Sequence, residues 1–333
     1  MVQWIKYASQ LTFKVKSLEN RNINTDTKYE IAENTLISRS IFDNIGEKGA
    51  IYLTNSSSSL IVDSSIFINC RTSFYGAAIY AKLRGASSFS FIKSCIDSCQ
   101  CTASNSYGNS FCIDGESNLH IIHVEHSTIT NCKGRFNDGV SIWRANSFIT
   151  FLNISGCRAD NGICGISTEQ GNICAQKYNE YSNHSSSYID SRGNKVDTIF
   201  RCIFRDCDPN KRDFMQVYKD TNLTFFSCTF RSCGDSFFGR QGESIVTCFD
   251  CYFDKEIQNS SLILIISKNE NFKQVFTYRS LAKCTFDNEK CSKRKPNLNS
   301  FIKLIVSLLF ESLLFLDLNK DVPIFFPDVI FDP

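Results

Sequence analysis

The sequence predicts an all-β protein whose fold is a right-handed parallel β-helix, a solenoid of about ten coils stacked along one axis. A short apolar motif recurs about every 25 residues. Apolar and polar residues alternate around the motif with the period of two that is typical of strands. Residues that favour tight turns follow the motif. The sequence has no Leu-x-x-Leu-x-Leu frame, which argues against a leucine-rich repeat.

A large apolar residue anchors each copy of the motif. Successive anchors are separated by 23 to 33 residues, except for one interval of 50 that indicates a degenerate copy between Ile154 and Phe204. A column of such residues would form the core of a solenoid, because equivalent positions of successive coils lie above one another. The anchors are Phe42, Phe67, Ile96, Ile129, Ile154, Phe204, Phe230, Phe253 and Phe286.

Three further columns accompany the anchors. Two positions before the anchor, on the same face of the strand, lies a small residue: Ser40, Ser65, Ser94, Ser127, Cys202, Cys228, Cys251 or Cys284. Two positions after it lies a residue that tolerates the left-handed conformation or binds its own backbone: Asn44, Asn69, Ser98, Asn131, Gly156, Asp206, Ser232 or Asn288. A thiol then follows in six copies: Cys70, Cys99, Cys132, Cys157, Cys207 and Cys233.

Several copies continue with a glycine and an apolar strand, as in Gly49-Ala-Ile-Tyr-Leu and Gly76-Ala-Ala-Ile-Tyr-Ala. One such coil cannot bury its apolar face, but coils stacked at about 4.8 Å share a continuous core. We therefore expect ladders in which Phe and Ile stack on Phe and Ile, and polar turn residues on polar turn residues. Right-handed winding is the general preference for parallel connections.

The segment Ser65-Ile-Phe-Ile-Asn-Cys-Arg-Thr-Ser-Phe-Tyr-Gly-Ala-Ala-Ile-Tyr80 resembles the Phe-x-x-Asn and Gly-Gly-Ala-Ile repeats of polymorphic-membrane-protein-like β-helix proteins of chlamydiae and trichomonad parasites. Residues 40–52 are a second match, and the similarity is strongest over residues 38–160. This chain has Cys in place of Asn at the last motif position and lacks the second Gly. The resemblance implies a surface-exposed, adhesin-like protein without enzymatic activity.

The chain divides into three predicted parts. Residues 1–34 form an irregular N-terminal cap, and residues 35–295 form the β-helix, with an insertion near residues 175–196. Residues 296–333 are an apolar C-terminal cap or membrane-associated tail. Within them, residues 301–316 are strongly apolar but short for a bilayer span and interrupted by Lys303 and Glu311. A short capping helix and a membrane-associated segment both remain open. The N-terminus has no apolar stretch of the signal-peptide type.

The charge balance excludes one class of partner. The 36 Lys and Arg nearly cancel the 34 Asp and Glu, which leaves a formal charge of +2. Nucleic acid is therefore not expected as a partner. The 17 Cys are many for a cytosolic enzyme but too few for a small disulfide-stapled domain.

The repeat offers a structural explanation for the cysteines. Cys202 and Cys207 precede Cys228 and Cys233 by 26 residues, so we expect each pair to stack in adjacent coils at a distance that permits a disulfide. Packed thiols, a disulfide and a four-thiolate metal site are the three alternatives. We expect structural thiols, and no metal or cofactor.

Two sets of polar residues are candidates for binding. His123 and Glu125 lie on one face of a predicted strand, where such a pair could move a proton or hold a metal, although it is an incomplete site. The Tyr-bearing stretch 176–188 interrupts the period, and long insertions in repeat proteins often carry recognition. Its candidate binding residues are Tyr178, Tyr181, His184 and Tyr188. The alternatives are a solvated strand face and a tolerated insertion.

The leading functional hypothesis is a non-catalytic β-helix scaffold, a surface or adhesin-like protein that binds an unknown protein or glycan surface. One alternative is a carbohydrate-active, pectin-lyase-like enzyme, but the chain contains no Asp-Asp or His-Gly dipeptide of the kind that polygalacturonase-like enzymes use. Another alternative is an intracellular interaction scaffold. The location of the protein in the cell is not predicted by the sequence beyond the resemblance to surface proteins.

Overall fold

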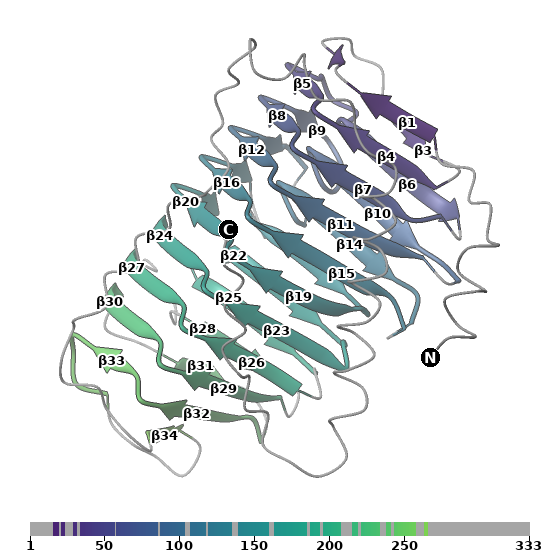
Figure 1. Cartoon of the computed structure of the whole chain (residues 1–333). Coiled ribbons are helices and arrows are strands. Elements are labelled where there is room, and N and C mark those ends of the chain that lie inside the picture. The colour runs from purple at the N-terminus through teal and green to yellow at the C-terminus, as the bar shows by residue number, and fades with distance from the viewer. Residues whose placement is uncertain are drawn as a thin grey trace, which may run out of the picture. The chain divides into compact units, whose positions relative to one another are not determined.

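The computed structural model in Figure 1 describes part of the chain. The described residues are 16–19, 21–23, 29–31, 34–56, 58–85, 87–103, 107–117, 119–134, 139–159, 163–184, 187–193, 196–207, 215–218, 221–233, 238–240, 243–257 and 263–265. The chain divides into two compact units, Met1–Phe286 and Asp287–Pro333, and all described residues belong to the first unit. The predicted tail 296–333 therefore lies outside the described residues.

The described chain is all β-structure, arranged in three large parallel sheets and one small one. Sheet A contains β1 (Lys16–Glu19), β4 (Thr35–Ser38), β7 (Leu60–Asp63), β11 (Ser88–Ile92), β15 (Ile121–Glu125), β19 (Asn146–Thr150), β23 (Ile173–Lys177), β26 (Val196–Phe200), β29 (Asn222–Phe226), β32 (Ile245–Phe249) and β34 (Ile263–Ile265). Sheet B contains β2 (Asn22–Ile23), β5 (Ile41–Asp43), β8 (Ile66–Ile68), β12 (Cys95–Asp97), β16 (Thr128–Thr130), β20 (Asn153–Ser155), β24 (Glu180–His184), β27 (Ile203–Cys207), β30 (Thr229–Cys233) and β33 (Tyr252–Phe253).

Sheet C contains β3 (Tyr29–Ile31), β6 (Ile51–Ser56), β10 (Ile79–Leu83), β14 (Phe111–Gly115), β18 (Val140–Trp143), β22 (Ile163–Glu169), β25 (Ser187–Arg192), β28 (Met215–Tyr218) and β31 (Phe238–Arg240). Sheet D is made of two-residue strands between sheets B and C: β9 (Arg71–Thr72), β13 (Gln100–Cys101), β17 (Lys133–Gly134) and β21 (Arg158–Ala159).

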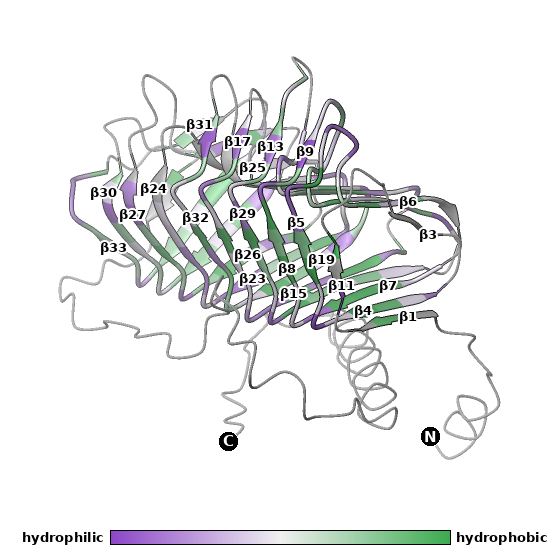
Figure 2. Cartoon of the chain, turned by 90° about the horizontal axis from the view of Figure 1, so that it is seen from above, coloured by the Kyte–Doolittle hydropathy of each residue, from purple (hydrophilic) through white to green (hydrophobic). Residues whose placement is uncertain are grey.

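The chain visits sheets A, B and C in turn, and each strand pairs in parallel with its equivalents in the neighbouring coils. This is the parallel β-solenoid that the repeat predicts. Each complete coil needs one strand from sheet C, and that sheet has nine strands. The described chain therefore has slightly fewer complete coils than the ten that we expected. Figure 2 shows hydrophobic residues concentrated along the strands and hydrophilic residues at the turns and loops.

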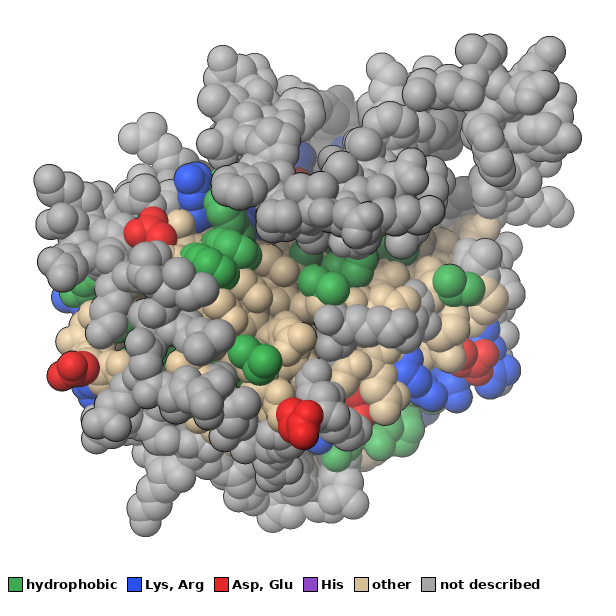
Figure 3. All heavy atoms as spheres, turned by 90° about the horizontal axis from the view of Figure 1, so that it is seen from below, with side chains coloured by type: hydrophobic (Ala, Val, Ile, Leu, Met, Phe, Trp, Pro, Cys, Tyr) green, Lys and Arg blue, Asp and Glu red, His purple; other side chains and the backbone are tan. Residues whose placement is uncertain are grey.

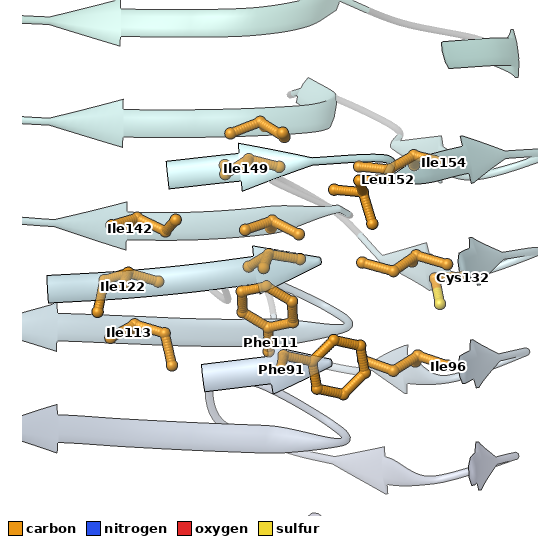
Figure 4. Packing of buried hydrophobic residues seen from close by; sticks show 14 of the residues in the cluster. Phe91, Ile96, Phe111, Ile113, Ile122, Cys132, Ile142, Ile149, Leu152 and Ile154 are labelled. Atoms are coloured by element: carbon orange, nitrogen blue, oxygen red, sulfur yellow. The ribbon is translucent and has the colours of Figure 1, made fainter. Parts of the chain in front are cut away.

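The predicted anchor column forms the core along sheet B. The ring of Phe42 stacks on that of Phe67 with their centroids 4.7 Å apart, and Phe230 stacks on Phe253 at 4.8 Å, with the rings nearly parallel. Between these ends, Ile96 pairs with Ile129 in register and both are fully buried. Figure 4 shows two anchors of this column, Ile96 and Ile154, in the interior with side chains from sheets A and C.

The residue predicted to turn the chain after each anchor does so in the left-handed conformation. Its φ angle is +51° in Asn44, +53° in Asn69 and Asn131, and +53° in Asp206. A second left-handed column, which the sequence did not reveal, lies at the corner between sheets A and B. Its residues include types that seldom favour this conformation: Arg39, Ser64, Lys93, His126, Phe151, Tyr178, Arg201, Ser227 and Asp250.

The small residue after this corner explains why the chain can turn there. The Ser94 hydroxyl donates to the carbonyl two residues earlier at 2.7 Å and accepts the backbone N–H of Ser65, in the preceding coil, at 3.0 Å. The Cys228 thiol makes the equivalent bonds, with the carbonyl two residues earlier and with the N–H of Cys202, both at 3.4 Å. Serine and cysteine thus satisfy backbone groups that the corner removes from the sheets.

We expected the stretch near residues 175–196 to protrude as an insertion, but it forms a regular coil. Strands β23, β24 and β25 pair in register with their neighbours in sheets A, B and C. Tyr181 is the anchor of this coil, because it pairs with Ile154 on one side and with Phe204 on the other. Its ring is fully buried and stacks on Phe204 with a centroid separation of 5.0 Å.

Candidate functional site

The predicted Tyr-bearing loop does not form one binding site. Tyr181 lies in the core, where its hydroxyl donates to Gln176 Oε1 at 2.6 Å and is 3.3 Å from Asn179 Nδ2. Gln176 and Asn179 are also buried. His184 lies at the end of β24, in register with Cys207, and Tyr188 lies in β25 on another sheet. Burial removes Tyr181 from the candidate binding residues.

Tyr178 is half-buried at the corner between sheets A and B. Its ring stacks on Phe151 at 5.2 Å, and Phe151 stacks on His126 at 4.6 Å, so the three rings form a ladder along three coils. The Lys177 ammonium lies 4.9 Å from the centre of the Tyr178 ring. Because the rings stack face to face, this ladder occupies the ring faces that a sugar would otherwise contact.

His123 and Glu125 lie on the outer face of β15, as the alternation predicts, but they meet a third residue. His126, the next residue along the chain, adopts the left-handed conformation and brings its Nε2 to 3.3 Å from the Glu125 carboxylate. The distance from His123 Nε2 to that carboxylate is 4.0 Å. Glu125 therefore lies within reach of two imidazoles.

The electrostatics of this group favour a neutral His123 and an ionised Glu125. Burial lowers the pKa of His123 below its usual value, and the nearby Glu125 carboxylate opposes this only in part. The hydrogen bond with His126 lowers the pKa of Glu125, although burial acts in the other direction. Within the described residues, no group of three or more His, Cys, Asp or Glu side chains has a geometry that could hold a metal ion.

The register places the late cysteines as the 26-residue offset predicts. Cys207 pairs with Cys233 between β27 and β30, and the Cys202 N–H donates to the thiol of Cys228. Among the described side chains, twelve cysteines are present as buried thiols, whereas Cys95 is disulfide-bonded. The buried Cys202 and Cys228 thiols hydrogen-bond to backbone groups of the corner between sheets A and B.

A cluster of aromatic rings on the outer side of sheet C is the most distinctive described surface feature, and the sequence analysis missed it. On β6 and β10, Ile51 and Ile79 point into the core, so the alternate residues Tyr52 and Tyr80 point outward. Their rings stack at 5.0 Å. We call the following residues the aromatic cluster of sheet C: Tyr52, Phe74, Tyr75, Tyr80, Tyr107 and Trp143.

Loops between sheets B and C supply the outer rings of this cluster. Tyr75 lies 5.9 Å from each of the Tyr80, Tyr107 and Trp143 rings, and Tyr107 meets Trp143 edge to face at 5.2 Å. At these separations the rings pack against one another and leave no ring-sized gap between them. The cluster therefore offers an outer surface rather than a cage.

Phe74 forms the exposed part of the cluster. Its ring contacts Tyr75 at 4.2 Å, yet 47% of the residue remains exposed. The chain turns toward it at Gly76, whose φ is +60° and where a Cβ would come within 2.0 Å of the Ile79 carbonyl oxygen. Glycine is therefore required for this loop to fold back over sheet C. Besides Phe74, the large hydrophobic residue that is exposed in the described chain is Leu119.

Paired charges lie beside the aromatic cluster. On β14, the Asp114 carboxylate accepts a hydrogen bond from Arg144 Nε at 3.1 Å and also binds the end of that guanidinium. At the next corner Arg84 forms an ion pair with Glu116. Burial, together with the nearby Cys112 and Asp114, raises the pKa of Tyr80, so its phenol stays neutral. The cluster is thus an uncharged aromatic surface with ion pairs at its edge.

The sequence contained a weak signal for this cluster. Tyr52 and Tyr80 occupy the same position in the Gly-Ala-Ile-Tyr and Gly-Ala-Ala-Ile-Tyr stretches, and Trp143 ends the similar Ser-Ile-Trp stretch. The outward direction of these residues follows from the strand period. The positions of the loop residues that complete the cluster depend on how the coils stack, which the strand period does not predict. On the face shown in Figure 3, by contrast, the described hydrophobic side chains form several separate groups.

The fold and its columns define this chain as a parallel β-solenoid repeat protein. In comparisons with known proteins, no family model, no curated protein and no solved structure matches it. Within the described residues there is also no helix long and apolar enough to cross a membrane. The apolar stretch 301–316 lies outside these residues, so its association with a membrane stays a prediction.

Proposed function

We propose that this chain is a non-catalytic β-solenoid scaffold that binds a protein or glycan surface, in the manner of adhesin-like surface proteins. The aromatic cluster of sheet C carries the proposal. It presents Tyr and Trp, which are enriched in recognition surfaces, on a stack of strands, and Arg144 and Arg84 lie at its edge. Its half-exposed Phe74 ring offers an apolar surface to a partner, because the other described residues leave about half of it uncovered.

The arrangement of charges supports binding rather than hydrolysis. A polysaccharide hydrolase needs two carboxyl groups several ångströms apart, one of them held protonated. Beside the aromatic cluster, the Asp114 and Glu116 carboxylates each have an Arg partner. Each Arg guanidinium occupies carboxylate oxygen atoms that would otherwise act on a substrate. The motif resemblance to polymorphic-membrane-protein-like proteins supports the same function.

A test compares binding by the purified chain and by variants at two residues of the aromatic cluster, the exposed Phe74 and the half-buried Trp143. The probes are a printed array of neutral and acidic glycans and a layer of immobilised mucin. Phe74→Ala and Trp143→Ala should each weaken binding at least about tenfold, the effect of losing a central aromatic contact. Leu119→Ala is the matched control, because Leu119 is 82% exposed and lies outside the cluster.

The outcomes separate the proposal from its rivals. If Phe74→Ala and Trp143→Ala bind as well as the control Leu119→Ala, the interface lies elsewhere and the proposal is contradicted. Turnover of a glycan on the array, measured as released reducing ends, would instead support a carbohydrate-active enzyme. Circular dichroism of each variant confirms that a loss of binding does not come from unfolding.

An intracellular interaction scaffold is the second candidate. The twelve buried thiols favour it, because free thiols persist in reducing compartments, whereas the disulfide of Cys95 is typical of an oxidising compartment. Antibody labelling of intact and permeabilised cells distinguishes the two locations. Labelling of intact cells supports the surface protein. Labelling that requires permeabilisation supports the intracellular scaffold.

A further inference from the structure

An Asn-Leu-Thr stretch lies on the outer side of sheet A. It is one of five stretches of the form Asn-x-Ser/Thr in the chain, which begin at Asn55, Asn153, Asn183, Asn222 and Asn259. Such a stretch is the acceptor sequence for an N-linked glycan in a secreted protein, and the sugar is attached to the asparagine amide. A chain rich in Asn and Ser contains some of these stretches by composition alone. The surroundings of each asparagine therefore decide which one can hold a glycan.

The Asn222 side chain points outward and is exposed. Asn222 is the first residue of β29, in which Leu223 and Phe225 are fully buried in the core. Because side chains alternate along a strand, Asn222 and Thr224 lie together on the outer face. Within the described part of the chain, the Asn222 amide makes no hydrogen bond through its side chain. The two polar groups of the acceptor sequence thus lie on one side of the strand, and the amide is accessible there.

Asn153 has the same type of sequence but a more enclosed position. It begins β20 in sheet B and pairs in register with Thr128 on one side and with Glu180 on the other. Its side-chain oxygen is buried and has no hydrogen-bond partner. A glycan on this amide would have to emerge between two neighbouring side chains. The side chains of the other three asparagines lie outside the described part of the structure, so Asn153 is the internal comparison for Asn222.

The residues beside Asn222 suit the first sugar of a glycan. Ile245, its partner in register on the next coil, is half-buried and offers an apolar contact. Three threonines continue the outer face of sheet A beside it, because Thr198, Thr224 and Thr247 follow one another in register. Their hydroxyl groups can donate and accept hydrogen bonds. A sugar on Asn222 therefore meets both an apolar side chain and hydroxyl groups.

The Asn222 site lies away from the aromatic cluster of sheet C. The strand of sheet C that leads to Asn222 is β28, and Trp143 of the cluster lies on β18, three strands earlier in that sheet. Three strand spacings correspond to about 14 Å along the solenoid. Asn222 also belongs to a different sheet. A glycan attached there therefore leaves the aromatic cluster open to a partner.

We propose that Asn222 is an N-glycosylation site, an inference that rests on the surface location in the proposed function. The Asn222 side-chain nitrogen forms a bond to the anomeric carbon of a lipid-linked oligosaccharide. The bond between that carbon and the pyrophosphate oxygen breaks. The amide loses one proton, and the departing lipid pyrophosphate takes it up. No atom is oxidised or reduced in this transfer.

The test is a glycosylation map of the full chain, secreted from cultured insect cells behind a cleavable export signal. The folded protein is treated with peptide-N-glycosidase in heavy-oxygen water, which converts each glycosylated asparagine into a labelled aspartate. Peptide mass spectrometry then locates the label. The proposal expects the label at Asn222 in most chains and at Asn153 in few.

Two variants at one position provide matched controls. Thr224→Ala removes the acceptor hydroxyl and should abolish the label at Asn222, whereas Thr224→Ser keeps a hydroxyl and should retain it. Asn222→Gln should leave binding by the aromatic cluster unchanged. A change in that binding would contradict the placement of the glycan away from the cluster. A secreted chain that is unmodified at Asn222, or a label that persists in Thr224→Ala, would overturn the proposal.

The chain isolated from its own cells tests the proposed function separately. A glycan at Asn222 in that material supports both the acceptor site and the surface location. If the native chain lacks the glycan while the secreted chain carries it, the surface location is contradicted and the acceptor site is not.

Discussion

The corner between sheets A and B is built differently in the early and the late coils of the solenoid. In the early coils its small residue is serine, as in Ser65 and Ser94, and in the late coils it is cysteine, as in Cys202 and Cys228. Both side chains donate to the carbonyl two residues earlier and accept an N–H from the preceding coil. The left-handed corner leaves the same backbone groups to be hydrogen-bonded in both halves. A hydroxyl binds them in one half and a thiol in the other, and these two groups differ in hydrogen-bond strength and in reactivity.

The largest expected effect tests what the two halves share. Phe67→Ala in the serine half and Phe230→Ala in the cysteine half each remove a fully buried ring that stacks on the anchor of an adjacent coil. Each should lower the free energy of unfolding by about 3–5 kcal/mol, measured by urea denaturation. Phe67→Leu and Phe230→Leu keep most of the buried volume and should cost less. A loss below about 1 kcal/mol in either half would mean that its anchor is not in the core.

The next effect measures the strength of the serine corner. Ser94→Ala removes a donor and an acceptor and leaves the buried N–H of Ser65 without its partner. We expect a loss of about 1–3 kcal/mol in the free energy of unfolding. Ser73→Ala, at an exposed position of the same half, is the control and should change little. Equal values for the two variants would show that the corner bonds do not contribute to stability.

A smaller effect is expected when the two chemistries are exchanged. Cys228→Ser replaces the thiol with a hydroxyl that makes the same pair of bonds in the early coils, so the cost should stay within about 1 kcal/mol. Cys228→Val keeps the volume but removes both bonds, and it should cost more than the serine variant. If valine were the better replacement in thermal unfolding, the thiol would act only by filling space.

The smallest effect is the dependence of stability on pH. His123 on β15 and Thr224 on β29 occupy equivalent positions of sheet A in the two halves, and only His123 can take up a proton. The pKa of His123 is lowered in the folded chain, so the unfolded chain binds a proton first when the pH falls below the usual value of 6.5, and stability decreases. The pKa of Glu125 is lowered from 4.5, so its contribution is present above that pH and is lost as the pH falls further. His123→Gln should remove the decrease between pH 6.5 and 5 in urea midpoints. Thr224→Gln should leave that decrease unchanged.

Much of the fold could be predicted because its determinants repeat. The anchors, the Asn turns and the offset between Cys207 and Cys233 each recur at fixed positions, so one copy informs the others. The corner column could not be predicted, because Phe151 and Tyr178 do not favour the left-handed conformation by themselves. Hydrogen bonds from the neighbouring coils impose it.

Tyr181 shows why a polar stretch that predicts a loop can form a regular coil instead. Tyrosine is seldom fully buried, and the residues around it include Gln176 and Asn179. In the structure, these two polar side chains bind the Tyr181 hydroxyl inside the core, so the polar residues serve the burial of the ring. The aromatic cluster of sheet C was missed for another reason: its loop residues, such as Phe74 and Tyr107, have no common spacing in the sequence.

The most direct test of the account is a crystal structure of the full chain, examined at the coil that contains Tyr181. We expect the Tyr181 ring to be buried between Ile154 and Phe204, with Asn179 in the position of the corner serine or cysteine and its N–H donating to the Cys202 thiol. A structure in which residues 176–188 leave the solenoid as a loop, with Tyr181 exposed, would contradict the register on which the columns and both proposals depend.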